Sequence, residues 1–116
     1  MIIKIQDIPP SMNKFNGREN SLAYRNEKRQ WKESVCWLAK GKERFEKARV
    51  TLTYHFADRR RRDPDNYCGK FILDGLTAAG VIPDDDFEHI ELVIRKGETA
   101  KQPWTEVEIT ELGGKE

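Results

Sequence analysis

The sequence predicts an α+β fold: a mixed four-stranded sheet with two helices, in a single small domain that spans residues 1–116. Apolar and polar residues alternate in short segments, as they do in half-buried strands, and apolar residues recur at helical spacing in two longer segments. A chain of 116 residues has the size of one domain with a modest core. The segments follow one another as strand, helix, strand, helix, strand, strand.

The first expected strand covers residues 1–6 and ends before Pro9 and Pro10, because two prolines cannot continue a hydrogen-bonded ladder. A polar loop, roughly residues 9–20, follows it.

A long helix is expected over residues 21–40. Tyr24, Trp31, Val35 and Leu38 recur at helical spacing and predict its buried face, with Trp31 as a core anchor. The opposite face is basic, so it is either solvated or part of a surface for a polyanion. Its cations are Arg25, Lys28, Arg29 and Lys32.

The second expected strand covers residues 47–56, where apolar and polar side chains alternate. A second helix is expected from Asp63 to Gly80. Aspartate is a favoured N-cap, Pro64 suits the first helical position, and glycine commonly ends a helix.

The last two strands are expected near residues 89–95 and 106–109, where apolar residues again alternate with polar ones. Residues 97–103 connect them and are long enough for a loose hairpin.

Composition excludes several classes of protein. No apolar run approaches the roughly 20 residues of a membrane span, and the N-terminus lacks the layout of a signal peptide. Cys36 and Cys68 form no paired framework, and with His55 and His89 they lack zinc-ligand spacing. We therefore expect a protein of the reducing cytoplasm with no membrane partner.

The net charge of +1 conceals a strong asymmetry. Residues 1–62 hold 16 Lys and Arg against 7 Asp and Glu, a balance of +9, whereas residues 63–116 hold 5 against 13, a balance of −8. Such a division indicates a surface for nucleic acid, unless the two halves interleave in space and neutralise each other.

The stretch from residue 59 to residue 89 contains the residues most indicative of chemistry. It opens with four arginines, passes into Asp63-Pro64-Asp65-Asn66 and closes on Asp84, Asp85 and Asp86. Like charges held together repel, so a divalent cation is the natural partner of the carboxylates and a polyanion that of the arginines. The combination predicts metal-assisted phosphodiester chemistry.

A polar row on the second expected helix supports this interpretation. At 100° per residue, Asp63, Asn66, Lys70 and Asp74 fall within about 80° on one face. A helix of about 16 residues would separate Asp63 from the later aspartates by some 24 Å, so the two acidic groups meet only if the later turn folds back or lies against another subunit.

These residues resemble the core of the RusA family of Holliday junction resolvases, found in bacteria and their prophages. The resemblance is strongest at Asp63-Pro64-Asp65-Asn66, Lys70, Asp74-Gly75-Leu76 and Asp84-Asp85, and it extends to Pro9-Pro10-Ser11-Met12-Asn13-Lys14 and to the last strand. It implies a homodimer that cuts four-way DNA junctions by paired symmetric nicks with Mg²⁺ or Mn²⁺, in DNA recombination and repair.

The resemblance also implies a role for particular residues. Asp63, Asp65 and Asp85 match the metal-binding aspartates, with Asp86 as the alternative to Asp85, and Lys70 matches a lysine needed for cleavage. Asn66 and Asp74 support this catalytic set. The DNA-contacting positions match Asn13, Lys14, Arg59, Arg60, Arg61 and Arg62.

The spacing departs from the family at one point. The family usually places the lysine three residues after the asparagine, whereas Lys70 is four after Asn66, with Gly69 between them. One extra helical residue rotates a side chain by about 100°. Either Gly69 absorbs the extra residue in a bulge, or Lys70 no longer reaches the scissile phosphate.

Two other functions are compatible with the same residues. A non-catalytic nucleic-acid-binding module would use the aspartates only as helix caps and solvated turns. A metal nuclease for other branched or single-stranded DNA would share the chemistry and differ in substrate.

Overall fold

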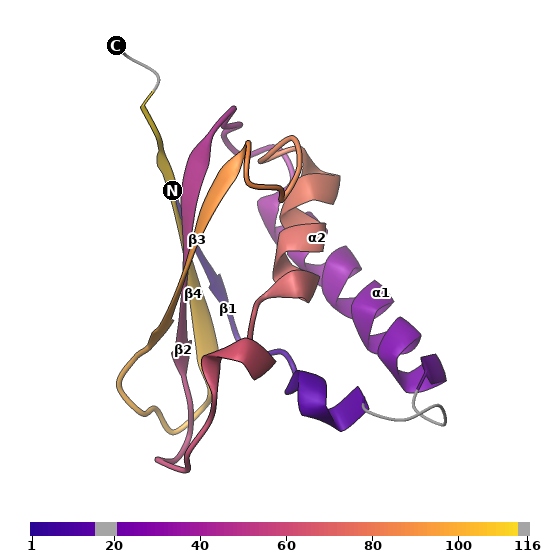
Figure 1. Cartoon of the computed structure of the whole chain (residues 1–116), viewed down its shortest axis with the longest axis vertical. Helices are drawn as coiled ribbons and strands as arrows, with labels where there is room; N and C mark the ends of the chain where they lie inside the picture. Colours follow the sequence, from indigo (N-terminus) through magenta and orange to yellow (C-terminus); the bar gives the residue numbers. More distant parts are fainter. Residues whose placement is uncertain (16–20, 114–116) are drawn as a thin grey trace.

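The structure, a computed structural model, describes residues 1–15 and 21–113, and over these ranges it confirms the α+β prediction. A four-stranded mixed sheet is covered on one face by two α-helices (Figure 1). In chain order the elements are β1 (Ile2–Ile5), the 3-10 helix η1 (Met12–Phe15), α1 (Ser21–Ala39), β2 (Ala48–His55), the 3-10 helix η3 (Pro64–Asn66), α2 (Lys70–Ala79), β3 (Ile90–Lys96) and β4 (Trp104–Glu111).

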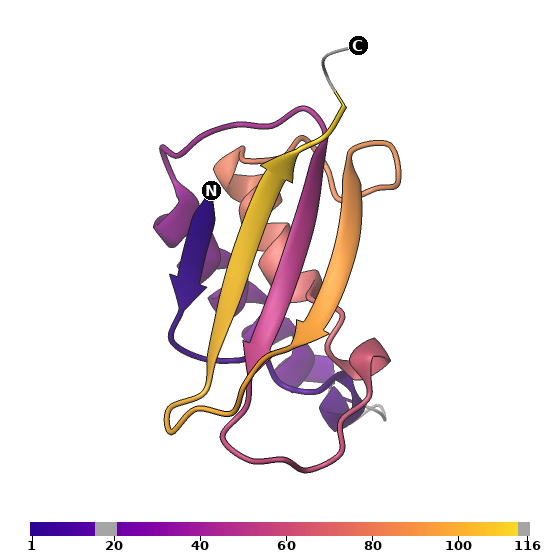
Figure 2. The ribbon, with the colours of Figure 1, turned by 90° about the vertical axis from the view of Figure 1, so that its left-hand side faces the viewer.

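The strand order is β1-β4-β2-β3 (Figure 2), so the predicted hairpin between the last two strands is wrong. β3 pairs in parallel with β2, because α2 carries the chain back across the sheet between them. β4 instead lies between β1 and β2 and is antiparallel to both. Residues 97–103 cross the end of β2, where the Gly97 amide donates to the Tyr54 carbonyl at 2.8 Å.

The core lies between the sheet and the helices. β2 is its centre, with Val50 and Leu52 fully buried beneath the two helices. The predicted stripe of α1 is partly correct: Val35 is buried, and Trp31 packs at the margin of the core. Leu38 is exposed, contrary to expectation, because Ala39, four residues after Val35, occupies the inward position.

The start of the second helix differs from the prediction. The Asp-Pro signal begins only the three-residue η3, and α2 begins at Lys70 after Gly69, whose φ is 79°. Tertiary contacts end η3: the Tyr67 ring packs 5.2 Å from that of Phe56, and the Tyr54 hydroxyl donates to the Tyr67 carbonyl at 2.9 Å. Asp63 and Asn66 therefore do not share a helical face with Lys70 and Asp74.

The described part of the chain, with its gaps at 16–20 and 114–116, has no helix that combines the length and the hydropathy needed to cross a bilayer.

Candidate active site

The arginine run and the first aspartates lie where the parallel strands β2 and β3 end. Four arginines follow β2, and η3 brings Asp63 back against the last residues of β3. A small hollow of about 70 Å³ lies between them, which we call the arginine hollow. It is lined by Tyr54, Phe56, Arg62, Asp63, Pro64, Tyr67, Ile94, Arg95 and Lys96.

Parallel pairing adds two cations to this end of the sheet. Because β2 and β3 run the same way, Arg95 and Lys96 finish next to the segment that begins at residue 56. From the sequence, Arg95 was expected only as part of a strand with alternating apolar and polar residues. The signal that would have found these cations is the helix between two strands, which favours a parallel crossover.

Asp63 and Asp65 hold carboxylates that the fold does not use for capping. Asp63 precedes η3 in an extended conformation, and its side chain makes no cap hydrogen bond. Its nearest charged partner is the Arg61 guanidinium, with Nε 3.4 Å from Oδ1. Over the described residues, the exposed Asp65 side chain has no hydrogen bond or ion pair. The capping explanation for Asp63 therefore finds no support in the geometry.

The four predicted DNA-contacting arginines are not equivalent. The side chain of Arg61 is 89% exposed, whereas that of Arg62 is 15% exposed. The Arg62 guanidinium stacks 4.1 Å from the centroid of Phe56 and pairs with Asp58 at 3.0 Å. The Arg60 amide and the Arg62 guanidinium together lower the pKa of the Asp58 carboxyl. Arg62 therefore fixes the loop, and the exposed arginines are left to contact phosphate.

This difference predicts separate effects on DNA binding. Arg60→Ala and Arg61→Ala should each weaken binding and reduce the slope of log K against log salt by about 0.9, the contribution of one phosphate contact. Arg62→Ala should instead lower thermal stability, because it removes the ion pair with Asp58 and the stacking on Phe56. Lys42→Ala, at the other end of β2, is the matched control and should leave the slope unchanged. Binding to a labelled junction at several salt concentrations measures all four slopes.

The predicted N-terminal contact residues lie near the same end of the molecule. Asn13 and Lys14 are exposed on η1, and Phe15 anchors η1 by packing against Tyr24 at 5.3 Å and Phe71 at 6.3 Å. Phe71 is the second residue of α2, so η1 sits beside the start of that helix (Figure 1). Residues 16–20 of the predicted loop lie outside the described residues.

Lys70 is exposed at the first position of α2, and Asp74 lies one turn further along. Asn66 lies in η3 and Lys70 in α2, with Gly69 in a left-handed conformation before α2, so the two residues do not lie on one continuous helix. Asp74 is half-buried, and its Oδ2 atom has no hydrogen-bond partner among the described residues. Asn66 is half-buried in η3.

The three later aspartates differ in how the turn uses them. Asp84 accepts a hydrogen bond from the Asp85 amide at 2.8 Å, and Asp86 accepts one from the His89 amide at 3.1 Å. Asp86 also lies 2.6 Å from the His89 ring nitrogen Nδ1. Over the described residues, the Asp85 carboxylate has no such partner. These contacts favour Asp85 over Asp86 as the residue available to a ligand.

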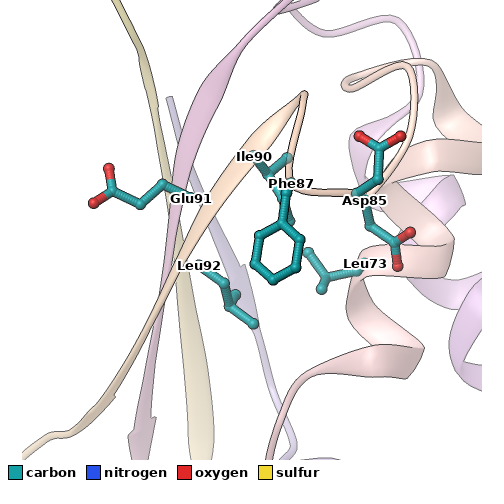
Figure 3. A pocket seen from close by; sticks show the side chains of 7 residues that line it. Leu73, Asp85, Phe87, Ile90, Glu91 and Leu92 are labelled. Carbon is teal, nitrogen blue, oxygen red and sulfur yellow. The ribbon is translucent and has the colours of Figure 1, made fainter.

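Asp85 lines a larger depression between the turn, α2 and β3, which we call the turn hollow. Its volume is about 600 Å³. Figure 3 shows the side chains that line it. Its lining is Leu73, Asp85, Asp86, Phe87, Ile90, Glu91 and Leu92. Phe87, which is fully exposed, was not predicted from the sequence; its signal is a lone aromatic residue inside an acidic turn.

The turn at residues 84–86 and η3, which carry the two acidic groups, lie at opposite ends of β3 (Figure 2). The turn hollow adjoins Ile90, and the arginine hollow adjoins Lys96, so six strand steps, or about 20 Å, separate them. Within the described ranges, no three acidic, histidine or cysteine side chains gather to hold one metal ion. The turn does not fold back along α2, so one chain brings Asp63 and Asp65 together and leaves Asp85 apart.

An α+β domain with exposed arginines and exposed carboxylates at the ends of two parallel strands is of the class that acts on nucleic acid. The family model described as Endodeoxyribonuclease RusA matches residues 7–110, and the chain belongs to this family. Membership implies nuclease activity of the Holliday junction resolvase type. No curated protein matches the chain.

Proposed function

We propose that the chain is a metal-dependent, structure-specific endodeoxyribonuclease that resolves Holliday junctions by paired symmetric nicks. The supporting observation is the pair of uncapped carboxylates, Asp63 and Asp65, beside exposed arginines at one end of the sheet. Family membership supports the reaction class, and the exposed carboxylates and arginines are the side chains that we propose for it.

The residues present fit Mg²⁺ or Mn²⁺. These ions prefer hard oxygen ligands, and Mg²⁺ is usually held by one or two carboxylates together with waters and substrate phosphate. Asp63 and Asp65 supply two such carboxylates from one turn. In a homodimer, Asp85 of the other subunit would supply the third. When bound, the ion would lower the pKa of a water molecule and offset negative charge on the phosphate.

The chain's own side chains position the substrate. Arg60 and Arg61 hold the DNA backbone without reading its sequence, since phosphate contacts carry no base information. Lys70, exposed at the start of α2, places a positive charge toward a nonbridging oxygen or the leaving group. A four-way junction is recognised by its shape, so paired nicks require two sites at a fixed spacing, which a two-fold dimer provides.

A comparison of substrates and metals tests this proposal. Labelled four-way junction, duplex and single-stranded DNA are each incubated with Mg²⁺, Mn²⁺, Ca²⁺ or EDTA. We expect paired nicks in the junction with Mg²⁺ or Mn²⁺ and no product with EDTA. Salt-sensitive binding without any metal-dependent product would show a non-catalytic binding module. Equal cutting of single strands or simple flaps would show a nuclease of different specificity.

A further inference from the structure

We propose that the groove between the last turns of α1 and α2 binds an unpaired nucleic-acid strand, with a base stacked on Trp37 and the phosphates on the neighbouring cations. This site is separate from the arginine hollow. The inference adds a binding surface to the proposed function, and its test needs no cleavage.

The first observation is an exposed tryptophan. Trp37 is 76% exposed, although it lies on α1 two residues after the fully buried Val35. The helix already has an aromatic anchor, because Trp31 packs against the core. Trp37 makes no hydrogen bond or ring contact with a described residue. A large ring that the fold does not use is suited to contact a ligand.

The second observation is a groove beside this ring, which we call the helix groove. Its volume is about 340 Å³, and it lies between α1 and α2, which end at the same side of the molecule (Figure 1). Trp37 lines it from α1 and Ala78 from α2. The charged residues that line it are Arg29, Lys32, Lys40 and Glu33.

Close packing of the two helices fixes the walls of this groove. A Cβ atom added at Gly75 would lie 2.5 Å from the Val35 Cβ atom, so α2 is pressed against α1 one turn before Ala78. The small side chain of Ala78 leaves space beside Trp37. The helix groove is therefore built by packed helices and not by a loop.

The third observation is charge, which selects the occupant. Arg25, Arg29, Lys32 and Lys40 are exposed, and at 100° per residue they fall within about 80° on one side of α1. None of them forms an ion pair with a described residue. The helix groove holds three of these cations against the single carboxylate of Glu33. Cations without partners in their own chain are complementary to a polyanion.

An aromatic ring among cations favours a single strand over a duplex. In a duplex the faces of the bases are stacked on one another, so a ring at the surface has no base face to contact except at a helix end. An unpaired strand offers its phosphates to the cations and a base face to the ring, which is the combination that single-strand binding surfaces use. We therefore assign the helix groove to an unpaired strand.

The row of cations leads from the helix groove toward the proposed cleavage end. Helix α1 rises about 18 Å from Arg25 to Trp37. Tyr24, which precedes Arg25, contacts Phe15 of η1 at 5.3 Å, and Phe71 at the start of α2 at 5.5 Å. A strand that leaves the groove along these cations thus runs toward η1 and the first turn of α2. The ligand class is DNA in which an unpaired segment adjoins a duplex.

Binding of a fluorescein-labelled oligothymidylate in EDTA tests the site. We expect Trp37→Ala to lower the affinity by about tenfold or more, which is the loss for one stacked base, and Trp37→Phe to lower it less, because it keeps an aromatic face. Phe87→Ala is the matched control, because Phe87 is also an exposed ring but lines the turn hollow. Far-UV circular dichroism checks the fold of each variant.

Tryptophan fluorescence locates the strand. The unlabelled oligonucleotide should quench the emission of the wild-type chain, and Trp37→Phe should lose this quenching. The other two tryptophans lie elsewhere: Trp31 packs against the core, and Trp104 is stacked on His55 at 4.2 Å.

Salt dependence tests the cations. Arg29→Ala and Lys32→Ala should each reduce the slope of log K against log salt by about 0.7, the contribution of one phosphate contact in a single strand. Lys47→Ala should leave the slope unchanged, because Lys47 is exposed before β2 and does not line the helix groove. A blunt duplex of the same length should bind the wild-type chain and Trp37→Ala equally.

An affinity for the strand that is unchanged in Trp37→Ala, or that falls only in Arg61→Ala, would overturn the inference. Equal weakening of duplex binding by Trp37→Ala would show a phosphate track for double-stranded DNA instead. A glutamate-rich peptide that binds more tightly than the strand, with the same dependence on Trp37, would show a surface for an acidic protein. Each of these results rejects the site and leaves the proposed nuclease function standing. Strand binding at Trp37 by a chain that never cuts a junction would reject the proposed function alone.

Discussion

Asp65→Asn is expected to abolish cutting of a synthetic four-way junction while leaving junction binding nearly intact. The substitution preserves the shape of the side chain and removes its negative charge, so the proposed metal ligand is lost and the arginines remain. We expect the cleavage rate to fall on the order of a thousandfold. The fold should not change, because the exposed Asp65 side chain makes no hydrogen bond or ion pair within the described residues. Single-turnover cleavage and gel-shift binding on the same junction measure the two effects.

The later turn supplies a paired control. Asp85→Asn should lose cleavage as Asp65→Asn does, because it removes the proposed third metal ligand. The turn should keep its structure, because the Asp85 carboxylate has no hydrogen-bond or ion-pair partner within the described residues. Asp86→Asn should retain most of the cleavage activity, because the Asp86 carboxylate is engaged by His89. Full activity of Asp65→Asn would remove the site assignment, and the opposite ranking of the two later variants would transfer the third ligand to Asp86.

Mixing the two inactive proteins distinguishes a shared site from a site within one chain. If Asp85 of one subunit joins Asp65 of the other, a heterodimer of Asp65→Asn and Asp85→Asn contains one site with every aspartate in place. Nicking of one strand should then return, while paired nicking should not. If each chain builds its own site, both subunits remain inactive and the mixture does not cleave the junction.

Local sequence patterns predicted the positions of the helices and strands better than the pairing of the strands. The alternation of residues 47–56 and the helical spacing around Val35 are properties of a few neighbouring residues, and both elements formed where expected. Strand pairing depends on distant residues. The hairpin expected through residues 97–103 failed because β3 had already paired with β2 through the α2 crossover.

The candidate site shows the same division. Asp63, Asp65 and the exposed arginines are close in space because they are close in sequence. Arg95 joins them only through parallel pairing, and Asp85 is kept away by the length of β3. Asp63-Pro64 does begin a helix, as predicted, but the contact of Tyr67 with β2 limits that helix to the short η3. Such tertiary contacts override local propensity and cannot be deduced from spacing alone.

Gly69→Ala is expected to cause a large loss of stability for a single added methyl group. Gly69 has a φ of 79°, a conformation that costs an L-residue about 1 kcal/mol or more. The added Cβ would also overlap the Cδ1 atom of Leu52, which is fully buried at the centre of the sheet. Overpacking of a core adds about 1–3 kcal/mol, so the free energy of unfolding should fall by roughly 2–4 kcal/mol.

Gly41→Ala separates the two causes. Gly41 has the same φ of 79°, but an added Cβ there meets no atom within 4 Å, so this variant pays only the backbone cost of about 1 kcal/mol. Urea unfolding of both variants at the same protein concentration gives the difference between the two losses of stability, which is the contribution of the Leu52 contact. Equal losses in the free energy of unfolding at the two glycines would mean that Leu52 and β2 shift to make room for the methyl group. In that case Gly69 is required only for its backbone conformation. Its close packing against Leu52 would then not be a rigid constraint on the start of α2 at Lys70.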